Sequence, residues 1–293
     1  MVKQKTLAIF AFIQLVLYPQ LCLVMEKPVV GFCVSQFYSP LVMYKRYQPL
    51  MDYLSDHTPY HFELIICRSN REALKLLKKG TAQILLLDDL AVLEAHEKLQ
   101  ALPILKPLNS YGQPYFRSAI VVADKSAIRK LRDLKGKNIA FGPHHSTQGN
   151  LFPRSLLKKN GISLGDLSSY KYLNTDEAIV KSLLTGNSDA GALVDVVAEK
   201  YVNRGLRIIA YTEPIPTSPI LVRKEAYNLI APTVMSALLN IKRNSSTDEL
   251  MEQWDMKIRY GFVPAKIADY QQDIRFIKSV STGCGKACHK AGG

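Results

Sequence analysis

Short apolar runs alternate with amphipathic segments along the chain from Pro28 onward. Runs at 29–34, 61–67 and 82–87 predict strands, while 41–57 and 70–80 carry apolar residues at helical spacing. In the first of these helices the expected apolar positions are Leu41, Tyr44, Leu50, Tyr53 and Leu54. Strand and helix in turn predict a parallel sheet with helices on both faces.

The alternation begins again after an extended run at residues 114–126. Strands are then expected at 138–141, 170–173 and 190–194, and helices at 151–161, 175–187 and 195–205. Residues 206–225 carry three prolines within six residues, which suits a crossing between lobes better than one continuous strand. Two further helical segments, at 227–242 and 246–254, would cover one of the lobes.

These patterns predict an α/β fold of two parallel-sheet lobes joined by two crossings, near residues 112–118 and 212–218. A chain of 293 residues is long enough for two lobes of ordinary size. We expect lobe 1 to comprise residues 26–117 and 214–281, and lobe 2 to comprise residues 118–213. Residues 282–293 would form a tail that contains cysteine.

The first 25 residues differ from the rest of the chain. Two lysines precede an almost uncharged run from Leu7 to Met25, and no acidic residue appears before Glu26. This pattern is typical of an export signal peptide, so we expect residues 1–25 to be cleaved during export. An uncleaved membrane anchor is the alternative, although a proline and a glutamine inside the run argue against it.

The formal net charge is +13, which favours an anionic partner. Nucleic acid is not expected, because the chain lacks a basic stripe with interleaved aromatic residues and a helix-turn-helix pattern. A hydrophobic content of 47% is typical of a globular protein. The charge therefore suggests a small anionic ligand rather than a polymer.

One polar turn interrupts the second series, in the stretch "FGPHHSTQGNLFPRSLL" at residues 141–157. The hydroxyls of Ser146 and Thr147 and the backbone N–H groups around them lie at the start of a helix, where an anion is stabilised. Pro153 implies that the regular helix starts late or kinks. The alternative is that Ser146 only caps the helix.

From about residue 29 to residue 242 the chain resembles the phosphate/phosphite/phosphonate-binding family of ABC-transporter substrate-binding proteins. The stretches that carry the resemblance are "YQPLMDYLS", "RSAIVV", "LRDLKGKNIAFGPHHSTQGNLFPRSLLKKNGI", "DAGALVD" and "TEPIPTSPILVRKE". The resemblance implies a bilobed type II periplasmic binding protein that closes on a small oxyanion or zwitterionic phosphonate. It further implies a periplasmic monomer without enzymatic activity, which presents its ligand to an ABC permease or a membrane sensor.

Carried over by position, the anion cradle would consist of Ser146, Thr147 and the amides of Gln148 and Gly149. Gly149 would permit a close approach of the backbone. His145 lies in the same turn and is a candidate for ligand binding. A nucleophile and base pair of Ser146 and His145 is not expected, because neighbouring side chains in an extended turn point apart. Nor do His144 and His145 have a third ligand spaced for a metal ion.

Phe37 and Tyr38 follow the first strand, where the carboxyl end of a parallel sheet opens into a cleft. They could form a wall of the pocket, or pack in the ordinary way. Asp195 follows the strand at 190–194, so it is a candidate at the edge of the cleft or else the N-cap of the next helix.

The chain departs from the family pattern at three acidic positions. Asp88 and Asp89 stand where family members often have a Gly-Pro pair, and Asp176 stands where the family frequently places a histidine. Asp176 could accept a hydrogen bond from a protonated oxyanion or, with Asp195, face the ammonium of a zwitterion. The alternatives are a helix N-terminal residue for Asp176 and a solvated loop for Asp88 and Asp89.

Of the five cysteines, Cys22 lies in the expected signal peptide and the other four fall into two groups. Cys33 and Cys67 each end an apolar run, where we expect small buried hydrophobic residues. Cys284, Cys288 and His289 form CxxxCH, one residue longer than the motif that carries covalent haem. A disulfide is the main interpretation, and haem, a metal ion or free thiols are alternatives. Haem would make His289 an axial ligand and favour a redox or sensing module; otherwise no cofactor is expected.

Overall fold

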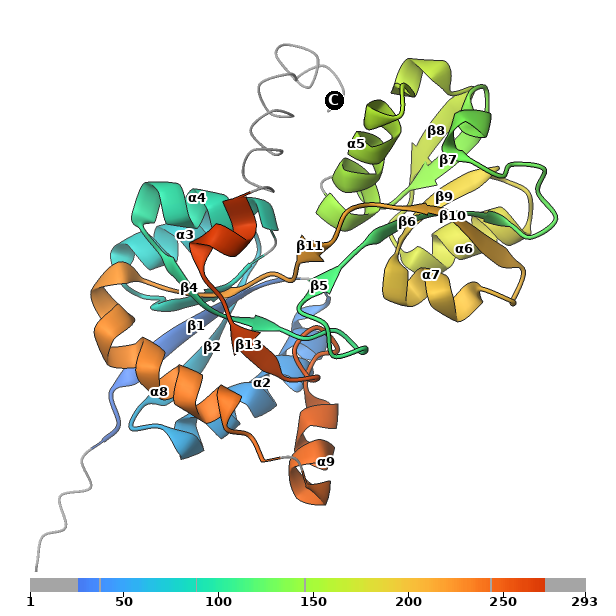
Figure 1. Cartoon of the computed structure of the whole chain (residues 1–293). Coiled ribbons are helices and arrows are strands. Elements are labelled where there is room, and N and C mark those ends of the chain that lie inside the picture. Colours follow the sequence, from blue (N-terminus) through green and yellow to red (C-terminus); the bar gives the residue numbers. More distant parts are fainter. Residues whose placement is uncertain (1–25, 37, 88, 145, 243, 272–293) are drawn as a thin grey trace, which may run out of the picture.

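The computed structural model describes residues 26–271 except 37, 88, 145 and 243. Two α/β lobes lie side by side and are joined by two extended segments (Figure 1). Within this described part, no helix has both the length and the apolar character needed to cross a membrane. The bilobed α/β fold expected from the alternating pattern is confirmed.

Lobe 1 contains a six-stranded sheet in the order β13-β4-β12-β3-β1-β2. Strand β1 pairs in parallel with β2 and β3, whereas β12 runs antiparallel to both β3 and β4. Strand β13 pairs antiparallel with β4 at the edge. The bounds of these strands are β1 Val29–Ser35, β2 His61–Cys67, β3 Ile84–Leu86, β4 Leu102–Pro107, β12 Ile220–Val222 and β13 Phe262–Pro264.

Helices cover both faces of this sheet. The larger core joins α2, α8 and the region after α9, and its fully buried members include Tyr47 and Phe32. A second core lies under α3 and α4 and includes Leu77. The expected apolar residues Leu41 and Tyr44 are 66% and 56% exposed, because they lie on the outer side of the first turns of α2. The helices are α2 Pro40–His57, α3 Asn70–Lys79, α4 Asp89–Leu99, α8 Tyr227–Leu239 and α9 Ser245–Gln253.

Lobe 2 contains a five-stranded sheet in the order β10-β6-β9-β7-β8. Strand β7 is parallel to β8 and β9, and β6 is antiparallel to β9 and β10. One face packs on α5 and the other on α6 and α7. The bounds are β6 Ser118–Ala123, β7 Asn138–Phe141, β8 Ser169–Tyr172, β9 Ala190–Val194, β10 Leu206–Tyr211, α5 Phe152–Lys159, α6 Asp176–Leu184 and α7 Asp195–Tyr201.

Two short strands, β5 (Tyr115–Phe116) and β11 (Ile215–Pro216), pair antiparallel between the lobes. They form the two crossings, as Figure 1 shows. Phe116 and Ile215 pack with Phe152 from the start of α5 in a small buried cluster. Strands β5 and β11, which we call the hinge, are therefore in direct contact with the first turn of α5 in lobe 2.

The expectation of purely parallel sheets is wrong, because both sheets are mixed. Strands β6 and β12 are the first to enter a lobe from a crossing, so each starts at the cleft and runs opposite to its parallel neighbours. Strands β4 and β13 were not expected from the sequence. Proline is the second and the last residue of β4 and the last residue of β13, and these strands lie next to the sheet edge and at it, where proline is tolerated.

Cys33 and Cys67 form a disulfide that joins β1 to β2, with 6.1 Å between their Cα atoms. Both residues are buried, at 0% and 1% exposure. The sequence-based expectation of two separate buried cysteines is therefore corrected. They can pair because the parallel register places Cys33 beside Ile65, and Cys67 lies two residues further along β2 on the same face of the sheet.

Candidate functional site

Strand β7 leads through a polar turn into helix α5. Ser146 is the N-cap of a π-helical turn, Thr147–Leu151, and its Oγ accepts a hydrogen bond from the Gly149 N–H at 2.9 Å. The α-helix begins only at Phe152, with Pro153 in its first turn, where a proline leaves no helical acceptor unpaired. The late helix start expected from Pro153 is confirmed, and Ser146 does act as a cap.

Two glycines bring this turn against the end of β7. The Gly142 N–H donates to the Gly149 carbonyl at 2.8 Å. A Cβ atom on either glycine would lie 2.9 Å from the Cα of the other, closer than real Cβ atoms approach a neighbour. The absence of a side chain at Gly149 is therefore required by its contact with Gly142 within the protein.

The backbone of the turn is held by buried polar side chains. Ser118, the first residue of β6, is fully buried, and its hydroxyl donates to the Gln148 carbonyl at 2.6 Å. Asn150 is also fully buried, and its side-chain nitrogen donates to the His144 carbonyl. Thr147 is 7% exposed, whereas Ser146 and Gln148 are partly exposed. Buried side chains thus hold the backbone of the turn, while Ser146 and Gln148 stay partly accessible to solvent.

Asp195 is the first residue of α7 and follows Val194, which occupies the N-cap. Its carboxylate accepts the Arg117 N–H at 2.8 Å and the Val196 N–H at 2.8 Å, and the residue is 6% exposed. Burial raises the pKa of this carboxyl, and the two backbone hydrogen bonds oppose the rise. Asp195 therefore joins α7 to the start of β6, next to the hinge, rather than acting as the N-cap.

Asp176 is the first residue of α6, after the N-cap Thr175, whose hydroxyl accepts the Ala178 N–H at 3.2 Å. The side chain is partly buried. Burial is the main cause that raises the pKa of its carboxyl; the charge of Glu177 adds to the rise and Lys257 opposes it. Lys257 belongs to lobe 1, so Asp176 lies on the side of lobe 2 that faces lobe 1.

Tyr38 belongs to lobe 1 and follows strand β1. The guanidinium carbon of Arg46 is 4.4 Å from the centroid of its ring, and Arg46 also donates to the fully buried Asp255 at 3.2 Å. Burial, followed by the charge of Asp255, raises the pKa of the Tyr38 hydroxyl, and Glu177 of lobe 2 contributes to the rise. The charge of Glu177, which belongs to lobe 2, thus reaches Tyr38 of lobe 1 as well as its neighbour Asp176.

Several candidate residues lie outside the described part of the chain. These are Phe37, Asp88 and His145, together with Cys284, Cys288 and His289 of the tail. Among the residues that are described, no group of three histidine, cysteine or acidic side chains is arranged to hold a metal ion. Asp176 and Asp195 have different charged neighbours, Glu177 and Lys257 in one case and Arg117 and Glu199 in the other.

Sequence reasoning missed the residues that support the site from a distance. Ser118 contacts the turn across 30 positions, and the Arg46–Asp255 pair spans 209 positions. A serine at the head of an otherwise apolar strand is a weak local signal for Ser118. No local pattern connects Arg46 to Asp255.

Solved structures with the same fold come from several bacteria. PhnD1 of Prochlorococcus marinus, in complex with methylphosphonate, is 17% identical with a TM-score of 0.69, and the match covers 87% of this chain and 99% of that one. A Xanthomonas citri protein bound to ATP is 19% identical with a TM-score of 0.68, covering 87% and 97%. A binding protein of a Pseudomonas aeruginosa phosphonate transporter is 15% identical with a TM-score of 0.65, covering 86% of each chain.

The family comparison covers most of the described chain. The matching family is described as the phosphonate periplasmic substrate-binding proteins of ABC transporters, and residues 32–270 match it. This range includes the hinge strands, the polar turn after β7 and both sheets apart from the first three residues of β1. The chain therefore belongs to the phosphonate-binding family of periplasmic substrate-binding proteins of ABC transporters.

Proposed function

We propose that this protein binds a small oxyanion with a phosphonate-like head between its lobes, with the turn at 146–149 as the cradle. The single observation that carries the proposal is the position of this turn, at the carboxyl end of β7 and the start of a helical segment. The first N–H groups of a helical turn lack acceptors within the helix, and an anion could replace the side-chain cap that Ser146 Oγ gives the Gly149 N–H. The hydroxyls of Ser146 and Thr147 would add charge-assisted hydrogen bonds.

The hydrogen bonds that hold the turn suit a role in anion binding. Ser118 and Gly142 fix the backbone of the turn, so the chain is already held in position when the ligand arrives. A relative with the same fold is in complex with methylphosphonate, which supports a phosphonate-like head as the ligand. Tyr38 of lobe 1 would form the facing wall, with Phe37 and His145 as further candidates.

Asp176 determines which anion is favoured, in one of two ways. Its raised pKa would allow a protonated carboxyl to share a proton with the oxyanion. As a carboxylate it would instead attract the ammonium of a zwitterionic phosphonate. Asp195 is a weaker candidate for the second role, because both of its oxygens already accept backbone hydrogen bonds.

Lobe closure about β5 and β11 would enclose the ligand and create the form that an ABC permease accepts. We place the lobe boundaries at 117/118, just after β5, and at 213/214, just before β11. A single chain supplies both walls, so a monomer suffices. A membrane sensor remains the alternative partner, and a haem-bearing or disulfide-bonded tail at Cys284, Cys288 and His289 would favour it.

The cradle is tested by Thr147→Val, which removes one buried hydroxyl at nearly constant volume. Loss of a charge-assisted hydrogen bond of about 1.5 to 3 kcal/mol predicts affinity for methylphosphonate about 10 to 150 times weaker by titration calorimetry. Thr233→Val is the matched control, because Thr233 is a partly buried threonine of α8 in lobe 1. Equal affinity of both variants and the parent would place the anion elsewhere.

A panel of phosphate, phosphite, methylphosphonate and 2-aminoethylphosphonate then separates the two roles of Asp176. If Asp176 attracts an ammonium, Asp176→Asn weakens binding of 2-aminoethylphosphonate and leaves methylphosphonate unchanged or tighter. If it shares a proton with the oxyanion, all four ligands weaken together. No binding of any member to the parent protein, after removal of copurified ligand by unfolding, would refute the oxyanion proposal.

A further inference from the structure

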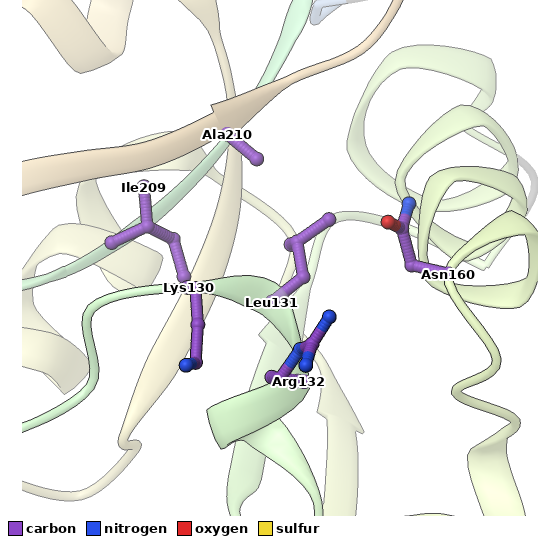
Figure 2. Close-up of a pocket in the computed structure, with 6 residues that line it drawn as sticks. All are labelled: Lys130, Leu131, Arg132, Asn160, Ile209 and Ala210. Carbon is purple, nitrogen blue, oxygen red and sulfur yellow. The ribbon is translucent and has the colours of Figure 1, made fainter.

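A hollow of about 310 Å³ lies on lobe 2, where α5 and the segment before β7 leave part of the edge strand β10 uncovered. Figure 2 shows Ile209 and Ala210 on β10, with Lys130, Leu131 and Arg132 beside them and the Asn160 amide directed toward the hollow. Aliphatic side chains from Leu131, Ile209 and Ala210 form its floor. Two cations and one amide form its rim.

The surface around the hollow is strongly basic. Residues 124–137 and 158–166, which we call the basic patch, contain eight lysines and arginines and three aspartates. A hydrogen bond from the Gly136 N–H to the Asp166 carbonyl, at 2.7 Å, joins the two segments. The patch thus carries a net charge of +5 out of +13 for the whole chain.

Two of the three acidic residues of the patch accept local hydrogen bonds. Asp133 accepts the N–H groups of Arg129 and Lys130 at 3.0 and 3.1 Å, and Asp166 accepts the N–H and hydroxyl of Ser163 at 2.7 Å each. Lys130 and Arg132 are exposed and make no salt bridge to a described residue. Their charge is therefore directed largely to solvent.

The basic patch lies opposite the cradle. Lys137 directly precedes β7, whereas the cradle follows its last residue, and α5 runs back from the cradle to Asn160. An object bound at the patch would leave the cleft free. The patch is therefore a second interaction surface, separate from the ligand site.

We propose that the basic patch binds an anionic phospholipid bilayer, with lipid phosphates at Lys130 and Arg132 and lipid carbons over the apolar floor. Dispersed exposed lysines do not converge on one small anion, but they match a surface of spaced negative charges. An amphiphile also accounts for a hollow with both a cationic rim and an aliphatic floor. Each cation close to such a surface contributes about 1 kcal/mol, and the attraction falls off within a Debye length of about 10 Å.

The test is cosedimentation of the protein, without its signal peptide, with vesicles. Two compositions are compared: phosphatidylcholine alone, and phosphatidylcholine with phosphatidylglycerol. We expect binding only to the phosphatidylglycerol vesicles, and loss of binding when salt is raised from about 0.1 M to about 1 M. Lys130→Glu with Arg132→Glu should weaken partitioning at least about 30-fold, which corresponds to loss of two cations. Lys78→Glu with Lys79→Glu, on exposed positions of α3 in lobe 1, makes the same charge change as a control.

A subtler pair of variants tests the hollow itself. Asn160 and Asn240 are both exposed C-cap residues, of α5 and α8. Asn160→Asp adds one negative charge at the hollow and should weaken partitioning about fivefold, whereas Asn240→Asp should not. This pair carries the test if the double variant at Lys130 and Arg132 fails to fold by circular dichroism.

Three results would overturn the proposal. Equal losses in the patch and control variants would assign binding to net charge alone. Equal binding to phosphatidylcholine vesicles, or no binding to either, would exclude an electrostatic bilayer surface. Displacement from vesicles by inorganic phosphate at constant ionic strength would make the hollow a site for a free anion instead. None of these outcomes bears on methylphosphonate binding at the cradle.

Discussion

Replacement of Cys33 and Cys67 by alanine removes the cross-link between the two first strands of lobe 1. These strands end at the cleft, and the Gln36 N–H donates to the Cys67 carbonyl at 3.0 Å, so the disulfide also fixes the loop that leads to Tyr38. The double variant should fold, because strands β1 and β2 keep their full parallel ladder. It should be less stable, mainly through its unfolded state.

The size of the effect follows from the length of the closed loop. The two cysteines are 34 positions apart, and the chain-entropy relation gives about 4 kcal/mol for a loop of this length. For a urea dependence of about 3 kcal/mol per M, the unfolding midpoint of lobe 1 falls by about 1.3 M. Lobe 2 contains no part of this loop, so its own transition should not move.

The measurement is urea unfolding of the variant and its parent, both with Cys284 and Cys288 replaced by serine. Fluorescence of Trp254, the single tryptophan and part of the lobe 1 core, reports the lobe 1 transition. Thiol labelling of the native parent should find neither Cys33 nor Cys67, because both are buried and paired. Labelling of both thiols, or identical midpoints for variant and parent, would refute the reasoning.

Two further predictions concern the cleft. Gly149→Ala should lower the thermal midpoint and weaken methylphosphonate binding, since its Cβ would meet the Gly142 backbone at 2.9 Å. The control Gly165→Ala, whose Cβ would have an ordinary contact at 3.7 Å, should do neither. Equal thermal midpoints of the two variants would contradict the close contact. Asp176→Asn should raise stability at neutral pH, because burial that raises the pKa of a carboxyl disfavours its ionised form. The stability of the parent should fall as the pH rises above the unfolded pKa of about 4, so the advantage of the variant should vanish below that pH. Thermal unfolding of both proteins at a series of pH values measures this difference.

The sequence predicts those parts of the fold that local periodicity specifies. Helices α2, α3, α6 and α7 and the parallel strands each have a clear pattern of their own, so the two lobes can be recognised. Strand β4 was missed because two prolines interrupt its apolar pattern, and β13 because it has only three residues and ends in proline. The antiparallel direction of β6 and β12 depends on where the chain re-enters each lobe, which no local pattern encodes.

The candidate site divides in the same way. Ser146 and Pro153 act through residues next to them in the chain, so the cap and the late helix start can be inferred from the sequence, whereas the contact of Gly149 with Gly142 could not be. The environments of Asp176 and Tyr38 depend on Lys257, Asp255 and Glu177, which approach from the other lobe or from distant positions. The pairing of Cys33 with Cys67 likewise requires the register of β1 and β2.

The contacts between cradle and hinge explain how ligand binding and lobe closure can be linked. Ser118 is the first residue after one crossing, and its hydroxyl donates to the Gln148 carbonyl. Its N–H donates to Thr212 Oγ1 at 2.9 Å, at the other crossing, so Ser118 links the turn to both crossings. Phe152, three residues after the cradle, packs on Phe116 and Ile215 of the hinge strands. An anion that stiffens the turn would therefore stiffen both crossings as well. A ligand shifts an equilibrium between two forms only if it binds one of them more tightly, and these contacts would carry such a preference from the turn at 146–149 to the hinge strands.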